Sequence, residues 1–233
     1  TQILAEPMSQ SLTKPKIMVC KTLINPTMAT LTAEKLKSAV FSRFGFHPPA
    51  WQIRQESIEK DYEVYVVVDG KYTVDYYRKS NYTFTVDEKV QDVVVLNQKL
   101  KPEPTRDPYR KLIQLEGQEH IVHQSKACVV LDAEGREISP RRVPSAPAEE
   151  HPEEVLDEFK KKKPLKIPLT DGTDILRSKI FKRPSEVHYV AQETLEILDH
   201  AIIYAPVYIA GLKNLRTGEE KTVKIDGVTG KLI

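Results

Sequence analysis

The sequence predicts an α+β fold in which a unit of one helix followed by an antiparallel β-meander occurs twice. The first observation is a repeated undecapeptide: LKSAVFSRFGF at 36–46 and LRSKIFKRPSE at 176–186 share leucine, a base, serine, a β-branched residue and phenylalanine in order. Four further short matches keep the same order, each about 140 positions apart. The spans 31–95 and 169–233 are equally long, so we interpret them as an internal duplication. Chance similarity helped by shared secondary structure is the alternative.

The composition is that of a folded chain. Of 233 residues, 40% are hydrophobic and 29% charged, which is too apolar for a disordered protein and allows a sizeable core. The net charge is only +2, so attraction to nucleic acid must come from local clusters of bases. The most apolar stretch, 201–212, is shorter than the roughly 20 residues of a membrane helix. Residues 1–15 hold no apolar signal core, so we expect a cytoplasmic protein without a membrane partner.

The first copy is expected to begin with a helix over 32–44. Thr32 is suited to cap its N-terminus, apolar side chains follow at helical spacing, and Gly45 ends it. Asp69-Gly70 predicts a tight hairpin between the first two strands of a meander. The predicted strands of this meander are 62–68, 71–77, 82–86 and 93–96.

The second copy repeats this order with shorter parts. Thr170 or Thr173 caps a helix that Pro184 ends, and strands follow within 193–212 and 220–228. Pro206 indicates that its strand lies at a sheet edge or carries a bulge, because proline has no N–H to donate.

A different kind of sequence separates the copies. Residues 111–138 predict two or three strands with turns at Glu116-Gly117 and Glu134-Gly135, whereas 139–154 is rich in proline and almost free of apolar residues. One short helix, acidic at its start and basic at its end, is expected within 153–168.

These patterns divide the chain into five parts, and the two repeats are expected to form a pseudo-twofold body. The parts are an N-terminal tail (1–15), α+β repeat A (16–100), a β-rich insertion (101–138), a Pro-rich charged linker (139–168) and α+β repeat B (169–233).

Signatures of catalysis are missing from the sequence. It contains no glycine-rich phosphate loop, no G-x-S-x-G and no H-E-x-x-H, so we expect neither an enzyme, nor a cofactor, nor a metal site. Glu119, His120 and His123 lie close together, but the two histidines point to opposite faces of a strand. A solvated edge strand is our interpretation, and a metal or proton-transfer site is the alternative. Cys20 and Cys128 are expected to be buried reduced thiols rather than a disulfide.

Tyrosines and bases cluster where a sheet and a linker are predicted. Rings on an open sheet with bases at its rim can stack unpaired nucleotides, and a mobile basic linker can neutralise phosphates. The alternatives are tyrosines that pair within the sheet and a solvated linker whose own acids quench it. The candidate nucleic-acid-binding residues are Tyr72, Tyr76, Arg78, Lys79, Lys160, Lys161, Lys162 and Lys163.

The sequence therefore favours a non-catalytic binding or assembly protein, a scaffold or adaptor that acts on a macromolecular partner, either protein or nucleoprotein. An RNA- or ribosome-associated factor is the first alternative. An enzyme with its site between the repeats is the second. The oligomeric state is not predicted.

Overall fold

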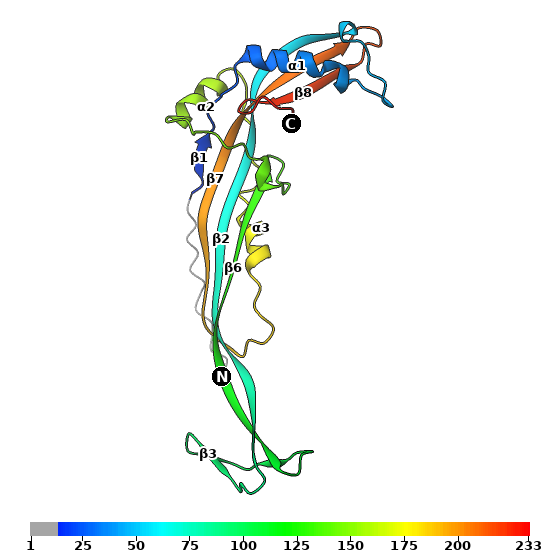
Figure 1. Cartoon of the computed structure of the whole chain (residues 1–233). Coiled ribbons are helices and arrows are strands. Elements are labelled where there is room, and N and C mark those ends of the chain that lie inside the picture. The colour runs from blue at the N-terminus through cyan, green and yellow to red at the C-terminus, as the bar shows by residue number, and fades with distance from the viewer. Residues whose placement is uncertain (1–13) are drawn as a thin grey trace. The chain divides into compact units, whose positions relative to one another are not determined.

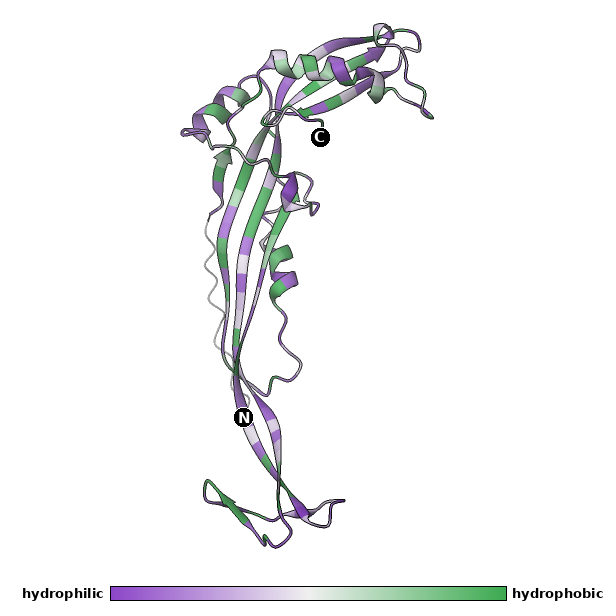
Figure 2. Cartoon of the chain, in the orientation of Figure 1, coloured by the Kyte–Doolittle hydropathy of each residue, from purple (hydrophilic) through white to green (hydrophobic). Residues whose placement is uncertain are grey.

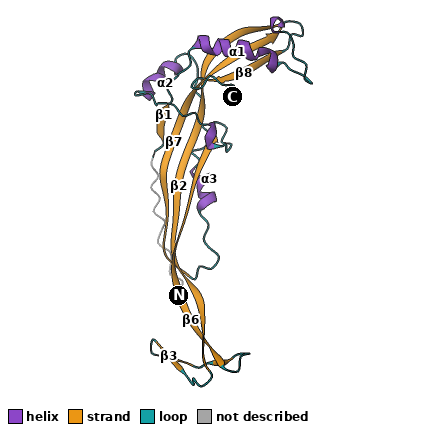
Figure 3. Ribbon diagram, viewed as in Figure 1, coloured by secondary structure: helices purple, strands orange, loops and turns teal. Residues whose placement is uncertain are grey.

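The computed structural model describes residues 14–233, so most of the predicted N-terminal tail lies outside the described residues. It confirms a mixed α+β class with three α-helices and far more strand than helix among these residues (Figures 1 and 3). The helices are α1 (Pro26–Val40), α2 (Pro152–Lys160) and α3 (Thr173–Ile180). The strands are β1 (Lys16–Val19), β2 (Ile53–Asp87), β3 (Val93–Val95), β4 (Gln98–Leu100), β5 (Glu103–Pro104), β6 (Arg110–Asp132), β7 (Tyr189–Asn214) and β8 (Glu220–Asp226).

One sheet holds most of the strands, in the order β1-β7-β2-β6-β5, with β8 also paired to β7. The strands β3 and β4 form a separate hairpin. The chain divides into two compact units, which we describe separately. Among the described residues, unit 1 comprises 71–126 and 180–196, and unit 2 comprises 14–70, 127–179 and 197–233.

The predicted hairpin at Asp69-Gly70 is wrong, because β2 is one continuous strand. Its buried side chains keep the same parity across the dipeptide, and Gly70 has no positive φ. A two-residue turn would have placed Lys71, Thr73 and Asp75 on the buried face, so the continuous strand is the arrangement that buries apolar groups. The buried residues of this face are Tyr62, Val64, Val66, Val68, Tyr72, Val74 and Tyr76.

The turn predicted at Glu116-Gly117 is also wrong, since β6 runs through it without interruption. The turn at Glu134-Gly135 is confirmed: Gly135 has φ 76°, and its N–H donates to the Asp132 carbonyl at 3.0 Å. Only the second dipeptide therefore acts as a turn.

Helix α1 begins earlier than predicted, at Pro26 instead of Thr32. The Asn25 side chain accepts a hydrogen bond from the Met28 N–H at 2.8 Å, and proline follows the cap directly, which is a strong start signal. Thr32 lies inside the helix and donates its hydroxyl to the Met28 carbonyl at 3.1 Å. The helix ends at Val40, before Gly45.

In unit 2, α1 packs on the β7–β8 hairpin, as Figure 1 shows. Ala29 and Ala33 are fully buried there, and their small side chains let the helix approach the strands closely. They belong to one cluster with Phe41, Ile53, Tyr208, Ala210, Leu212, Val223 and Ile225.

Pro206 lies where β7 changes partners along one edge. Strand β1 pairs in parallel with β7 up to Tyr204, and β8 pairs antiparallel from Val207 onward. The carbonyl of Pro206 accepts a hydrogen bond from Gly227 at 2.8 Å. Its strand is therefore not an edge strand, but the proline stands between the two pairings on that side.

The segment predicted as a linker packs on the sheet of unit 2. Its backbone is hydrogen-bonded to β1 and to Lys21, two residues beyond that strand. The Glu149 N–H donates to the Val19 carbonyl at 2.8 Å, and the Lys21 N–H donates to the Pro147 carbonyl at 2.8 Å. The predicted helix is confirmed as α2, with Glu153 and Glu154 in its first turn. Its Leu156 is buried in a cluster with Val19, Tyr62, Val64, Ala133 and Tyr204.

Helix α3 begins at Thr173 and ends at Ile180, before Pro184. Thr173, predicted as a possible cap, is instead the first helical residue, and its N–H donates to Asp171 Oδ1 at 3.0 Å. Gly172, just before it, has φ 80°, and a Cβ there would lie 3.0 Å from Val68 and 3.2 Å from Leu131. Glycine is needed here for two reasons: its backbone adopts a positive φ, and it has no Cβ to meet Val68 and Leu131.

We predict that Asn25→Ala destabilises the protein by about 1 kcal/mol, because it removes the side-chain acceptor at the start of α1. Denaturant unfolding of the full chain measures this. Thr32→Ala is the matched control and should change the free energy of unfolding by much less. Equal losses in the two variants would contradict the observed start of the helix.

Candidate protein-binding interface

In unit 1, residues 79–125 form what we call the arm. It comprises the end of β2, the β3–β4 hairpin, and β5 with the first part of β6. Tyr82 of β2 lies against Gly117 of β6, where a Cβ on the glycine would meet the ring at 3.0 Å. Arg110 of β6 reaches the hydroxyl of Thr85 on β2 at 3.4 Å. Strand β2 and the first half of β6 are therefore partners in the arm.

The arm has almost no core of its own. Ile113 is its only fully buried large apolar side chain, and Figure 2 shows hydrophilic and hydrophobic residues mixed along its strands. A two-stranded ribbon without a packed face is only marginally stable in water. Its exposed large hydrophobic residues are Tyr82, Phe84, Val94, Leu96, Tyr109 and Val122.

Leu96 presents the most exposed of these side chains, at 92%. It has φ 49° and Asn97 has φ 63°, so two residues without glycine's freedom form the left-handed turn between β3 and β4. Leucine in this conformation costs roughly 1–2 kcal/mol. Backbone strain of this kind is concentrated at functional sites, such as ligand-binding and switch regions.

One long edge of the arm has no backbone partner among residues 14–233. Strand β5 pairs only with Lys111 and Leu112 of β6, and the next pairing on that strand outside β2 is the bridge from Leu131 to Glu137. We call residues 114–125 of β6 the free edge. It contains neither proline nor lysine, two residues with which proteins often block exposed edges, and its charged residues are Glu116 and Glu119. Such an edge can accept a strand from another chain.

The charges of the arm balance, with seven bases and seven acids within 79–125. Glu119 accepts hydrogen bonds from the Tyr82 hydroxyl and from Arg78, both at 2.7 Å. These two bonds, the tyrosine's first, hold the pKa of the Glu119 carboxyl below its usual range. The arm therefore offers no net positive field to a polyanion.

Tyr72 and Tyr76, predicted to stack nucleotides, are buried, with exposures of 0% and 2%. The Tyr72 ring packs against Phe181 at 5.0 Å, and its hydroxyl donates to Glu193 at 2.6 Å. The Tyr76 hydroxyl donates to Glu186 at 3.3 Å. The segment from Ile180 to Glu196 thus supplies partners to these tyrosines, and neither ring is available to stack on a base.

The predicted bases do not form one cluster. Arg78 pairs with Glu119 at 2.7 Å and Glu186 at 3.5 Å, whereas Lys79 is exposed. In unit 2, Lys160 pairs with Asp157 at 3.2 Å and Lys163 with Asp61 at 2.8 Å. Lys161 and Lys162 are exposed and form no ion pair with the described residues.

The histidine cluster is engaged in local pairs. His120 pairs with Asp75 and stacks on Tyr77, with ring centroids 4.6 Å apart. No three His, Cys, Asp or Glu side chains within residues 14–233 are placed to hold a metal ion.

The two cysteines are both free, and burial of the Cys20 thiol raises its pKa. The prediction that Cys128 is buried is wrong, since it lies exposed in β6.

One ionic network of unit 1 was not predicted from the sequence. Arg183 donates to Glu193 through Nε at 2.7 Å and through a second nitrogen, and Tyr72 donates to the same carboxylate. Hydrogen bonds from Arg183 lower the pKa of Glu193, against the opposing effect of burial, and the bond from Tyr72 adds to the lowering. No motif links these residues, because they come from β2, β7 and the loop between α3 and β7.

Comparison with protein-family models, with curated proteins and with solved structures gave no match to this chain. No helix among the described residues is both long and apolar enough to span a membrane.

We predict that Glu193→Gln destabilises the protein by about 1–2 kcal/mol at pH 7, since it weakens charge-assisted hydrogen bonds to Arg183 and Tyr72. Because the folded pKa lies below the ordinary value of 4.5, this stabilisation is complete above that pH and is lost as the pH falls through the folded pKa. Unfolding at pH 7 and at stepwise lower pH should show the two proteins converge. Glu196→Gln, at an exposed position of β7, is the control and should show no such dependence.

Proposed function

We propose that this chain is a non-catalytic assembly protein whose arm binds a partner protein by adding a partner strand to the free edge of β6. The observation that carries the proposal is the free edge itself, because main-chain donors and acceptors along 114–125 have no described partner on that side. A partner strand would satisfy them with main-chain hydrogen bonds. The fit between its side chains and the alternating side chains of β6 would give the contact its specificity.

The exposed apolar residues of the arm support a protein as the partner. Val122 lies within the free edge with 55% exposure, and Leu96 and Tyr109 add apolar surface elsewhere on the arm. Interfaces gain most from aromatic and large apolar anchors. The balanced charge of the arm supports the same choice, since binding to nucleic acid relies on excess positive charge.

Most of the residues on which the two alternative functions relied are buried or paired. An RNA-associated factor would now depend on Lys79, Lys161 and Lys162, because Tyr72 and Tyr76 are buried. An enzyme using the histidine cluster would have to break its present pairs, such as that of Glu119 with Arg78. Neither alternative gains a specific observation in its favour.

We also propose that the two matched segments derive from one duplicated helix–strand unit. Each repeated undecapeptide begins inside a helix, and the helices end at matching positions, Val40 and Ile180. Each helix is followed by a long strand, β2 or β7, and these strands are neighbours in the sheet. The similarity is limited to this helix and strand, because no hairpin follows within the first copy as β8 follows β7.

Photo-crosslinking with the full chain tests the assembly function. The crosslinker p-benzoylphenylalanine is placed at Gln124 on the free edge, or at Thr217 in the β7–β8 turn as the control. We expect a defined protein adduct at Gln124 that is absent at Thr217 and lost on Val122→Lys, which puts a charge on the edge without touching a core. Amides of 114–125 should exchange more slowly in the purified complex than in the free chain.

Adducts of equal yield at both positions, or unchanged exchange of the edge amides, would contradict the proposal. An adduct of twice the chain's mass would identify the partner as a second copy. The variant must keep the unfolding midpoint of the unmodified protein, which separates loss of binding from loss of fold.

We further predict weak or no binding of single-stranded RNA at moderate salt, because the arm is neutral and the lysine run is partly paired. Fluorescence anisotropy at two salt concentrations measures this, with the double change Lys161→Ala and Lys162→Ala. Tight binding that falls steeply with salt, and that this variant abolishes, would favour the nucleic-acid alternative instead.

A further inference from the structure

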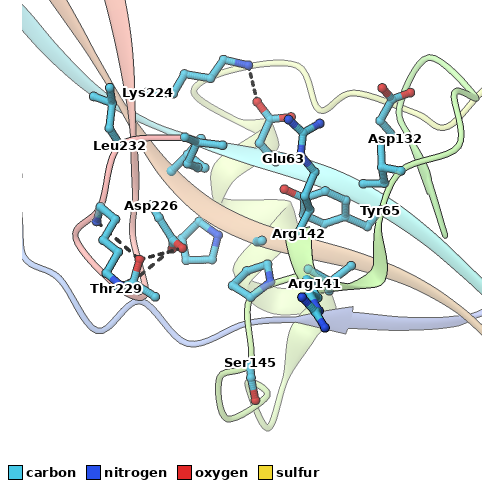
Figure 4. A pocket seen from close by; sticks show the side chains of 18 of the residues that line it. Glu63, Tyr65, Asp132, Arg141, Arg142, Ser145, Lys224, Asp226, Thr229 and Leu232 are labelled. Carbon is cyan, nitrogen blue, oxygen red and sulfur yellow. Dashed lines mark hydrogen bonds and ion pairs between the residues drawn. The ribbon is translucent and has the colours of Figure 1, made fainter.

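Unit 2 contains a groove of about 690 Å³, which is within the usual size of small-molecule sites. Its walls come from β2, from β7, from β8 with the turn after it, and from the segment 132–145 (Figure 4). It shares no residue with the arm, so it is independent of the proposed function.

The groove is lined by six bases and four acids. Three of the acids are already neutralised: Glu63 pairs with Lys224, and Asp132 pairs with Arg136 at 2.8 Å. Glu134 pairs with Arg136 at 3.3 Å and with Lys166 at 3.8 Å.

The fourth acid, Asp226, accepts hydrogen bonds from the Val228 N–H at 2.7 Å and the Thr229 hydroxyl at 2.9 Å. Arg141, Arg142 and Lys231 form no ion pair with the residues that the structure describes. The groove therefore holds more positive charge than its own acids compensate.

The two arginines stand on a fixed segment. The Ser139 carbonyl accepts from Arg142 N–H at 2.9 Å, and the Pro140 carbonyl accepts from Val143 N–H at 3.2 Å, which closes a tight turn. Ile138 before this turn and Val143 after it pack against a cluster of Tyr65, Val130 and Ala205. Because both flanks are anchored, less conformational entropy is lost when the guanidinium groups bind an anion.

One wall of the groove is apolar and aromatic. Figure 4 shows Arg142 beside Tyr65 and Glu63. Burial, and then the neighbouring acids Glu63 and Asp226, raise the pKa of Tyr65 to about 12, so its phenol remains protonated at neutral pH. The apolar lining residues are Ile138, Val143, Pro144, Ala205, Pro206, Val207, Leu232 and Ile233.

We propose that this groove binds a small phosphate-bearing organic molecule. Arg142, which Figure 4 shows beside Tyr65, takes the phosphate, since its guanidinium group offers paired donors to the phosphate oxygens, and Arg141 and Lys231 add positive charge to the groove. The organic part lies against Tyr65 and the apolar wall. A bare phosphate ion would leave this wall unused, because the groove is far larger than one ion.

Calorimetric titration of the full chain with phenyl phosphate tests the site. We expect saturable binding that is tighter than that of inorganic phosphate, because only phenyl phosphate reaches the apolar wall. Arg142→Gln should weaken it about tenfold, the effect of losing one charge-assisted hydrogen bond. Arg216→Gln, an exposed base outside the groove, is the matched control and should bind as the unmodified chain does.

Benzoate distinguishes phosphate from carboxylate as the anionic group, since it carries one charge instead of two. Binding of benzoate as tight as that of phenyl phosphate would overturn the phosphate assignment. Absence of saturable binding up to about 10 mM, which corresponds to under 3 kcal/mol of affinity, would overturn the site. Equal binding by the Arg142→Gln and Arg216→Gln variants would do so too.

Discussion

The fold depends on the unbroken two-residue alternation of β2. From Tyr62 to Tyr76 every even position is buried, whereas Tyr65 is the one buried odd position, so a slip of one residue would move the buried set to the other face. This constraint forces the chain through Asp69-Gly70 without turning. It also fixes which residues face the helices and which, such as Glu63 and Tyr65, face the groove. Register, more than local turn preference, decides this part of the structure.

Local signals predicted elements well where no distant partner competed with them. Helix α2 and the turn at Gly135 follow from caps, charges and glycine. The hairpin at Asp69-Gly70 could have been rejected from the sequence, since the apolar parity continues across it. The start of α1 could also have been predicted from Asn25-Pro26, a cap residue followed by a proline at the first helical position. The packing of the proline-rich segment on the sheet could not be predicted from the sequence, because its hydrogen bonds to Val19 and Lys21 join parts of the chain that are far apart in sequence.

The candidate sites also divide into what local sequence predicts and what depends on distant partners. Tyr72 was correctly placed in a strand, yet its burial depends on Phe181 and Glu193, which lie more than a hundred positions away. Composition identified bases but not their partners, so Arg78 and Lys163 were counted as available although each meets a carboxylate. The free edge and the groove are properties of pairing and of packing. No residue pattern within 114–125 predicts the free edge, and none within 132–145 predicts the groove.

The free edge also limits how far this protein can assemble through it. Among the described residues of the arm, β6 offers one long open side, because β2 occupies the other. If two copies met along 114–125 in antiparallel fashion, the free edge of each would be occupied by the other. Growth through this edge would stop at a pair with twofold symmetry, because both free edges are then occupied. A strand from a different partner would occupy the same edge and leave it unavailable to a second copy.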